Sequence, residues 1–68
     1  MSVDDSQINP GHYKFDNIEV IELTEQLSFN RGNAVKYICR AGRKSPVTEL
    51  IDLEKARWYI QREIKRLT

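Results

Sequence analysis

The sequence has a single cysteine, Cys39, among its 68 residues, so no disulfide can form within the chain. With apolar residues such as Val35 and Ile38 nearby in the sequence, Cys39 is expected to be a small core residue. No apolar run approaches the roughly 18 residues needed to cross a bilayer, and the polar, acidic start over residues 1–7 lacks the features of a secretory signal. We therefore expect a cytoplasmic protein without a membrane partner.

The chain is also short. A domain of this size buries only about 60% of its unfolded surface and is marginally stable alone, so we expect a homo-oligomer. The content of 40% hydrophobic and 31% charged residues is typical of a globular chain and not of a disordered one.

Acidic residues are absent between Gln26 and Thr48, although five of the eleven basic residues fall there. Within this stretch a stripe of side chains at helical spacing is formed by Asn33, Lys36, Tyr37 and Arg40. Arg and Lys match phosphate oxygens, so the stripe indicates a site for a phosphorylated ligand. The alternative is a solvated helix face. A net charge of +1 argues against a protein that coats DNA.

The pattern predicts an all-α fold: a compact three-helix domain over residues 16–68 that follows an irregular N-terminal arm over residues 1–15. The turn signal Asn9-Pro10-Gly11 lies in that arm. Asp16 or Asn17 can cap a first helix that runs to about Ser28. Its acidic residues at three-residue steps, Glu19, Glu22 and Glu25, would repel one another unless a positive surface faces them.

Two further helices are expected. The second begins near residues 30–32 and ends at Gly42, a natural left-handed stop residue. The third begins at Ser45-Pro46, where a capping hydroxyl precedes a proline, and it runs almost to the end. No segment has the pattern of a strand. A near-heptad apolar stripe of the third helix can pack inside the monomer or against a partner chain: Leu53, Ala56, Ile60, Ile64 and Leu67.

Three blocks of the sequence, over residues 8–14, 29–44 and 52–59, resemble the SaV-like family of small phage and prophage domains, long labelled only as a domain of unknown function. One class in that family resembles a podophage nucleotide kinase that phosphorylates nucleoside monophosphates without a Walker loop. This sequence likewise lacks G-x-x-x-x-G-K-[ST]. The resemblance implies a phage-type nucleotide-binding protein in the host cytoplasm, with kinase-like activity if it is catalytic.

If the arm and the last two helices converge, they assemble a site. The ligand-binding candidates are Tyr13, Lys14, Asn33, Lys36, Tyr37, Arg40, Arg43, Lys44 and Lys55. In it Lys36 and Arg40 would clamp phosphate oxygens, and Tyr13, Tyr37 or Trp58 would stack on a base. The catalytic candidates are His12 and Asp52, and Glu49 and Asp52 could hold Mg²⁺, the candidate cofactor. A structural alternative is that Asp52 pairs with Lys36 or Arg40 and holds the helices together.

Several other functions remain open. The protein could be a non-catalytic oligomer that sequesters a signalling nucleotide and so counters a host defence. The pairs Glu22-x-x-Glu25 and Glu49-x-x-Asp52 resemble the acidic helix pair of MazG-type nucleotide pyrophosphatases, although charges at this spacing are usually solvated. A nucleic acid is a less favoured partner, and binding to a host protein is the last alternative.

Overall fold

The computed structural model describes residues 14–15, 18–43 and 45–68. In chain order these residues form strands β1 (Lys14–Phe15) and β2 (Ile18–Glu19), helices α2 (Val20–Thr24) and α3 (Phe29–Arg40), the 3₁₀ turn η2 (Pro46–Thr48) and the long helix α4 (Glu49–Leu67). The fold is all-α, as expected from the sequence.

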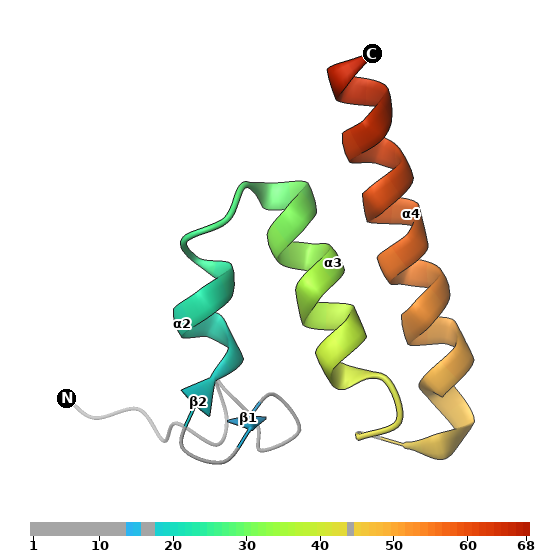
Figure 1. Cartoon of the computed structure of the whole chain (residues 1–68). Coiled ribbons are helices and arrows are strands. Elements are labelled where there is room, and N and C mark those ends of the chain that lie inside the picture. The colour runs from blue at the N-terminus through green and yellow to red at the C-terminus, as the bar shows by residue number, and fades with distance from the viewer. Residues whose placement is uncertain (1–13, 16–17, 44) are drawn as a thin grey trace, which may run out of the picture.

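The three helices lie side by side in one layer, with α3 between α2 and α4 (Figure 1). Helices α3 and α4 are antiparallel and are joined by the short connection that contains η2. Because there is only one layer, helix α3 has a neighbour on each side and two faces that no other described helix covers. The site described below depends on the packing of α3 against α4.

The first helix is shorter than the sequence predicts. Residues Ile18–Glu19 are extended and pair antiparallel with Lys14–Phe15, and helix α2 then begins at Val20, which is buried. It ends after five residues, in turns closed by the Leu27 N–H, which donates to the Thr24 carbonyl at 3.0 Å. The acidic residues three apart, which disfavour a longer helix, offer a physical reason for this difference.

The boundaries of the second helix follow the sequence closely. Helix α3 begins after Ser28, an extended residue, and it ends at Arg40 because Ala41 leaves helical geometry. Gly42 follows with φ 78°, in the left-handed region that glycine adopts at helix ends. At the other end of α3, Gly32 faces α2 so closely that a Cβ atom there would lie 2.9 Å from the Thr24 carbonyl oxygen.

The start signal of the third helix is confirmed. The Val47 N–H donates to the Ser45 Oγ at 3.2 Å, and Pro46 occupies the first position of the turn. The 3₁₀ turn η2 ends at Thr48, and α4 begins at the next residue, Glu49.

The inner face of α4 is polar at both ends. Its buried residues are Asp52, Ala56 and Glu63, and the buried residues of α3 are Gly32 and Ala34. Of the predicted apolar stripe, only Ala56 is buried, and the four larger members are 44% to 61% exposed. Ala56 is therefore the one member of the stripe that belongs to the core of the single chain, as the structure describes it.

Candidate functional site

Three cationic side chains lie around the ring of Tyr37. The Lys36 Nζ is 4.5 Å from the ring centroid, the Arg40 Cζ is 5.0 Å from it, and the Lys55 Nζ, which comes from α4, is 5.2 Å away. These distances are within the range of about 6 Å in which a cation is attracted to a ring. Helix spacing explains the arrangement, because residues 36, 37 and 40 share one side of α3.

Tyr59 of α4 extends this group of rings. Its ring is nearly parallel to that of Tyr37, with an interplanar angle of 11° and centroids 6.0 Å apart. Phe29 and Trp58 meet Tyr59 edge to face, at 6.1 and 5.0 Å. We call Lys36, Tyr37, Arg40, Lys55 and Tyr59 the cationic–aromatic cluster. It offers flat apolar surface beside positive charge, the combination that a base and a phosphate require.

Arg40 is anchored by a carboxylate. Its Nη2 and Nε donate to the same oxygen of Asp52, Oδ1, at 2.7 and 3.1 Å. The side chain of Asp52 is completely buried, whereas that of Arg40 is 14% exposed. The structural alternative considered for Asp52 is therefore present, and this ion pair joins α3 to α4.

The two lysines of the cluster differ from Arg40. Among residues 18–43 and 45–68, no carboxylate lies within ion-pair distance of Lys36 or Lys55. Lys36 is half-buried and Lys55 is exposed. Their ammonium groups are thus the cations of the cluster that a ligand can reach without displacing an internal carboxylate.

A hollow of about 310 Å³ lies beside the cluster, between α2 and α3, and Lys36 lines it. From α3 it is also lined by Phe29, Gly32 and Asn33. Asn33 donates from its Nδ2 to the Phe29 carbonyl at 3.0 Å, which fixes the amide at the wall of the hollow. This volume is at the lower end of the range of about 300–1,000 Å³ for small-molecule sites.

The remaining candidates lie at the edge of the site or outside the description. Arg43 is exposed just beyond α3. Residues His12, Tyr13 and Lys44 are outside the described residues, and Lys14 is described only as part of the backbone of β1. Their roles stay predictions.

The carboxylates do not form a metal-ligand group. Glu49 is exposed in the first turn of α4, and Asp52 is bonded to Arg40. Within the described part of the chain, no three His, Cys, Asp or Glu side chains gather closely enough to hold a metal ion. The acidic pairs of the MazG-type alternative therefore gain no support from these residues.

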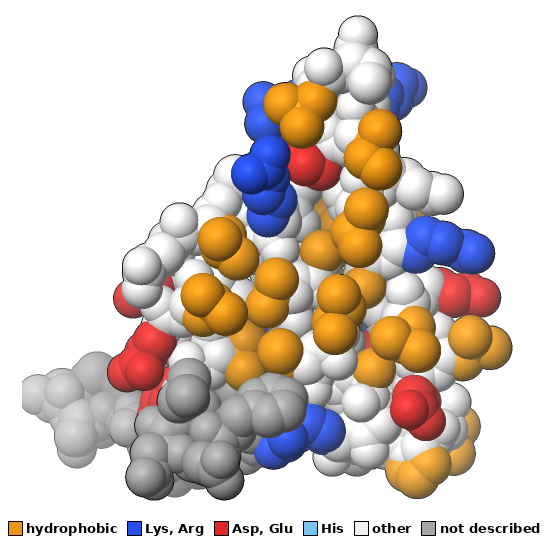
Figure 2. All heavy atoms as spheres, in the orientation of Figure 1, with side chains coloured by type: hydrophobic (Ala, Val, Ile, Leu, Met, Phe, Trp, Pro, Cys, Tyr) orange, Lys and Arg blue, Asp and Glu red, His pale blue; other side chains and the backbone are white. Residues whose placement is uncertain are grey.

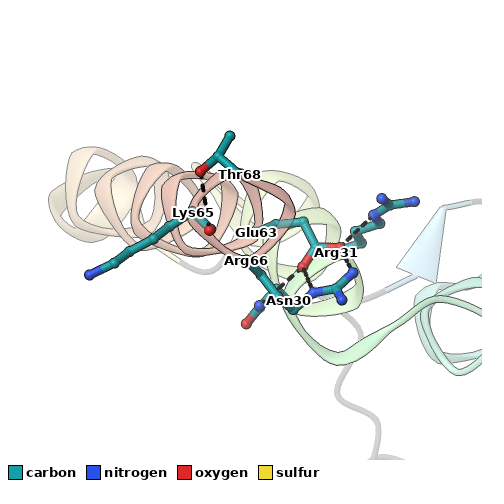
Figure 3. Close-up of polar contacts among 6 residues, drawn as sticks. All are labelled: Asn30, Arg31, Glu63, Lys65, Arg66 and Thr68. Atoms are coloured by element: carbon teal, nitrogen blue, oxygen red, sulfur yellow. Dashed lines mark hydrogen bonds and ion pairs between the residues drawn. The ribbon is translucent and has the colours of Figure 1, made fainter.

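A second polar cluster, around Glu63, was not predicted from the sequence (Figure 3). Arg66 donates from Nε and Nη2 to the two oxygens of Glu63, at 3.0 and 3.1 Å. Asn30 and Arg31 of α3 donate to the same carboxylate, at 3.2 and 2.8 Å. The hydrogen bond from Arg66, followed by those from Asn30 and Arg31, lowers the pKa of Glu63 to about 2. The sequence did contain one indication of this cluster. Glu63 follows Asp52 by eleven residues and therefore lies on the same face of the helix.

The sequence model of a family described as a protein of unknown function, DUF3310, matches residues 8–61. The chain belongs to the DUF3310 family. The matched region includes all of α2 and α3 and the cluster residues of α4.

No curated protein and no solved structure matches the chain. In the part of the chain that the structure describes, no helix is both long enough and apolar enough to cross a membrane.

Proposed function

We propose that this protein binds a nucleotide, or another small phosphorylated ligand, at the cationic–aromatic cluster. The observation that carries the proposal is the convergence of Lys36, Arg40 and Lys55 on the ring of Tyr37. Ammonium and guanidinium groups are the usual partners of phosphate, and an aromatic ring is the usual partner of a base. The cluster provides both within one helix pair.

The lysines are the groups that would touch the phosphate. Lys36 and Lys55 approach Tyr37 from different helices, so a phosphate between them would receive charge from both sides. Arg40, held by Asp52, would act on the ligand mainly through its fixed charge. The hollow lined by Asn33 and Phe29 would take the sugar or the base, since it lies directly beside Lys36.

The resemblance to the SaV-like phage and prophage domains, and through them to a podophage nucleotide kinase, also supports a nucleotide as the ligand. On this basis we propose that a phage or prophage encodes the protein and that it acts in the host cytoplasm. The family that matches the chain carries no assigned activity in its description, so the ligand is argued from the residues.

Phosphoryl transfer is not part of the proposal. Kinases hold Mg²⁺ on carboxylates that face the phosphates. The residues here do not fit such a site, because Asp52 is completely buried against Arg40. Among the described residues, no three His, Cys, Asp or Glu side chains gather as a group that could hold a metal ion. We therefore propose binding without turnover, which agrees with the hypothesis of a protein that sequesters a signalling nucleotide.

The test is thermal unfolding with a panel of ribonucleoside and deoxyribonucleoside mono-, di- and triphosphates, with nucleosides as the uncharged comparison. A ligand at 100 times its Kd stabilises the folded state by about 2.7 kcal/mol. We expect stabilisation by at least one nucleotide and none by its nucleoside. The nucleotide recovered after denaturation should be chemically unchanged, and recovery of a product would contradict binding without turnover.

Variants then locate the site. Lys36→Ala and Lys55→Ala remove reachable cations without breaking an internal ion pair, so each should weaken binding about tenfold or more while the fold persists. Arg57→Ala is the matched control, because Arg57 is an exposed cation on the opposite side of the same helix. Unchanged affinity in both lysine variants would rule out the cluster as the site.

Single-stranded nucleic acid is a second candidate ligand, and a specific observation favours it. Two hollows near the C-terminal end of α4, of about 220 and 340 Å³, share Arg62 and Lys65 in their linings, and the first also contains Trp58. Arg62 follows Lys55 by seven residues and so lies on the same side of α4, roughly 10 Å further along. A strand could pass from the cluster to this second group of cations.

Oligothymidylates of increasing length distinguish the two ligands. If a strand is bound, affinity should rise with length, fall steeply with salt and decrease in Arg62→Ala. If a mononucleotide is the ligand, Arg62→Ala should bind it as well as the unaltered protein does, and longer strands should show no gain.

A further inference from the structure

Helix α4 exposes a continuous apolar surface on the side that α3 does not cover. Figure 2 shows hydrophobic side chains along the length of α4 on this face of the molecule. Leu50 is 67% exposed, and Leu53, Ile60, Ile64 and Leu67 are 45%, 44%, 56% and 61% exposed. A large contiguous apolar patch on a small protein marks a surface that another chain covers.

The spacing of these residues is that of a coiled coil. In a heptad with d at Leu53, Ile60 and Leu67, the a positions are Leu50, Arg57 and Ile64. Five of the six seam positions are therefore aliphatic, and the single exception is Arg57. The seam extends through most of α4, a helix of 19 residues.

We propose that this seam binds the same seam of a second copy of the chain, with the two α4 helices antiparallel. The surface is self-complementary in that orientation, because an antiparallel pair brings each a position opposite a d position. One register then pairs all six positions: Leu50 with the partner's Leu67, Arg57 with the partner's Ile60, and Ile64 with the partner's Leu53.

Arg57 decides between the two orientations. In a parallel pair a positions face a positions, so Arg57 would face the partner's Arg57 within one apolar layer, and like charges there repel. In the antiparallel pair each Arg57 lies beside an isoleucine and can extend its guanidinium to the edge of the seam. A polar residue at one a position is a known device for fixing orientation and register.

The pairing leaves the ligand site open. Lys55 and Arg62 occupy the f positions of this heptad, which lie opposite the seam on the helix. The interface is thus independent of nucleotide binding, and either proposal can fail without the other.

The oligomeric state tests the interface. Light scattering after size exclusion should give a mass of about twice the 8.0 kDa of one chain. Ile60→Glu, which places a charge at the centre of the seam, should give a monomer with an unchanged helical circular dichroism spectrum. The matched control is Ile51→Glu, because Ile51 is 51% exposed on the same helix but lies outside the seam, and it should remain a dimer. A monomeric unaltered protein, or a dimer that survives Ile60→Glu, would overturn the proposal.

Cysteine cross-linking tests the orientation, in a Cys39→Ser background. A disulfide requires Cα atoms about 4.4–6.8 Å apart. Leu50→Cys combined with Leu67→Cys should give a covalent dimer on oxidation, whereas Leu67→Cys alone should not, since the partner's Leu67 lies at the far end. Efficient cross-linking of Leu67→Cys alone would show a parallel pair and refute the antiparallel one.

Discussion

Arg40 and Asp52 form an ion pair between α3 and α4 in which the Nη2–Oδ1 distance is 2.7 Å and the carboxylate is completely buried. A buried carboxylate that loses its cation keeps its desolvation cost without compensation, typically about 3–5 kcal/mol. The total stability of a small domain is only about 5–15 kcal/mol.

We therefore expect Arg40→Ala to destabilise the protein by about 3–5 kcal/mol, measured by urea unfolding. The double variant Arg40→Met with Asp52→Leu should recover most of this loss, because it removes both charges and keeps the volume. The control is Arg57→Ala, which removes an exposed cation of α4. Because Arg57 lies in the proposed dimer seam, this control is made in the monomeric Ile60→Glu variant, and there it should change the free energy of unfolding by less than about 0.5 kcal/mol. If Arg40→Ala changes the free energy of unfolding as little as Arg57→Ala does, the ion pair does not stabilise the packing of α3 against α4.

Glu63 predicts a dependence of stability on pH. Its pKa in the folded protein is about 2, below the ordinary value of 4.5, because it accepts hydrogen bonds from Arg66, Asn30 and Arg31. A depressed folded pKa gives a contribution that is complete above about pH 4.5 and is lost as the pH falls toward 2. The difference in urea midpoint between the unaltered protein and Glu63→Gln should accordingly shrink between pH 5 and pH 2. A difference that stays constant over that range would contradict the depressed pKa.

Gly32 predicts a steric effect at the contact between α2 and α3. Alanine is the better helix former, but its Cβ would lie 2.9 Å from the Thr24 carbonyl oxygen, a backbone atom that can move only with α2. Gly32→Ala should therefore destabilise the protein by about 1–3 kcal/mol, by the general cost of overpacking. Gln61→Ala, at an exposed position of α4, provides the comparison and should be nearly neutral. A more stable Gly32→Ala would mean that α2 moves aside without cost.

Cys39 predicts slow thiol chemistry. Partial burial raises the pKa of its thiol, and the charge of Arg43 opposes this by lowering it. Because the thiolate is the reactive form, labelling with a thiol reagent at neutral pH should be slower in the folded protein than in urea. Arg43→Ala removes the opposing charge and should slow labelling further. Faster labelling of that variant would show that Arg43 does not act on the thiol.

Much of the fold could be predicted because its helix ends are marked by local chemistry. Gly42 and Ser45-Pro46 determine backbone geometry within a few residues of themselves, and the structure places the helix boundaries there. The start of α2 was not predictable in the same way, because Ile18–Glu19 pair with Lys14–Phe15 in an antiparallel ladder of two residues on each strand. Strands this short are too brief to give an alternating pattern in the sequence.

The cluster was partly predictable for the same reason. The side chains of α3 share one face by helix periodicity, and Lys55 was correctly expected to meet them from the facing helix. The inner face of α4 was harder to assign. Hydrophobic spacing draws attention to Leu53 and Ile60, yet the buried residues are Asp52, Ala56 and Glu63, because charged partners on α3 compensate the two carboxylates.

Those two carboxylates have a consequence for how α3 aligns along α4. Asp52 pairs with Arg40 and Glu63 pairs with Arg31. The two carboxylates lie eleven residues apart on α4, which is about three turns of helix. A slip of one helix past the other by a single turn would separate both carboxylates from their partners at once, whereas an aliphatic contact would tolerate such sliding. The helix pair therefore has only one axial alignment in which both carboxylates keep their cationic partners.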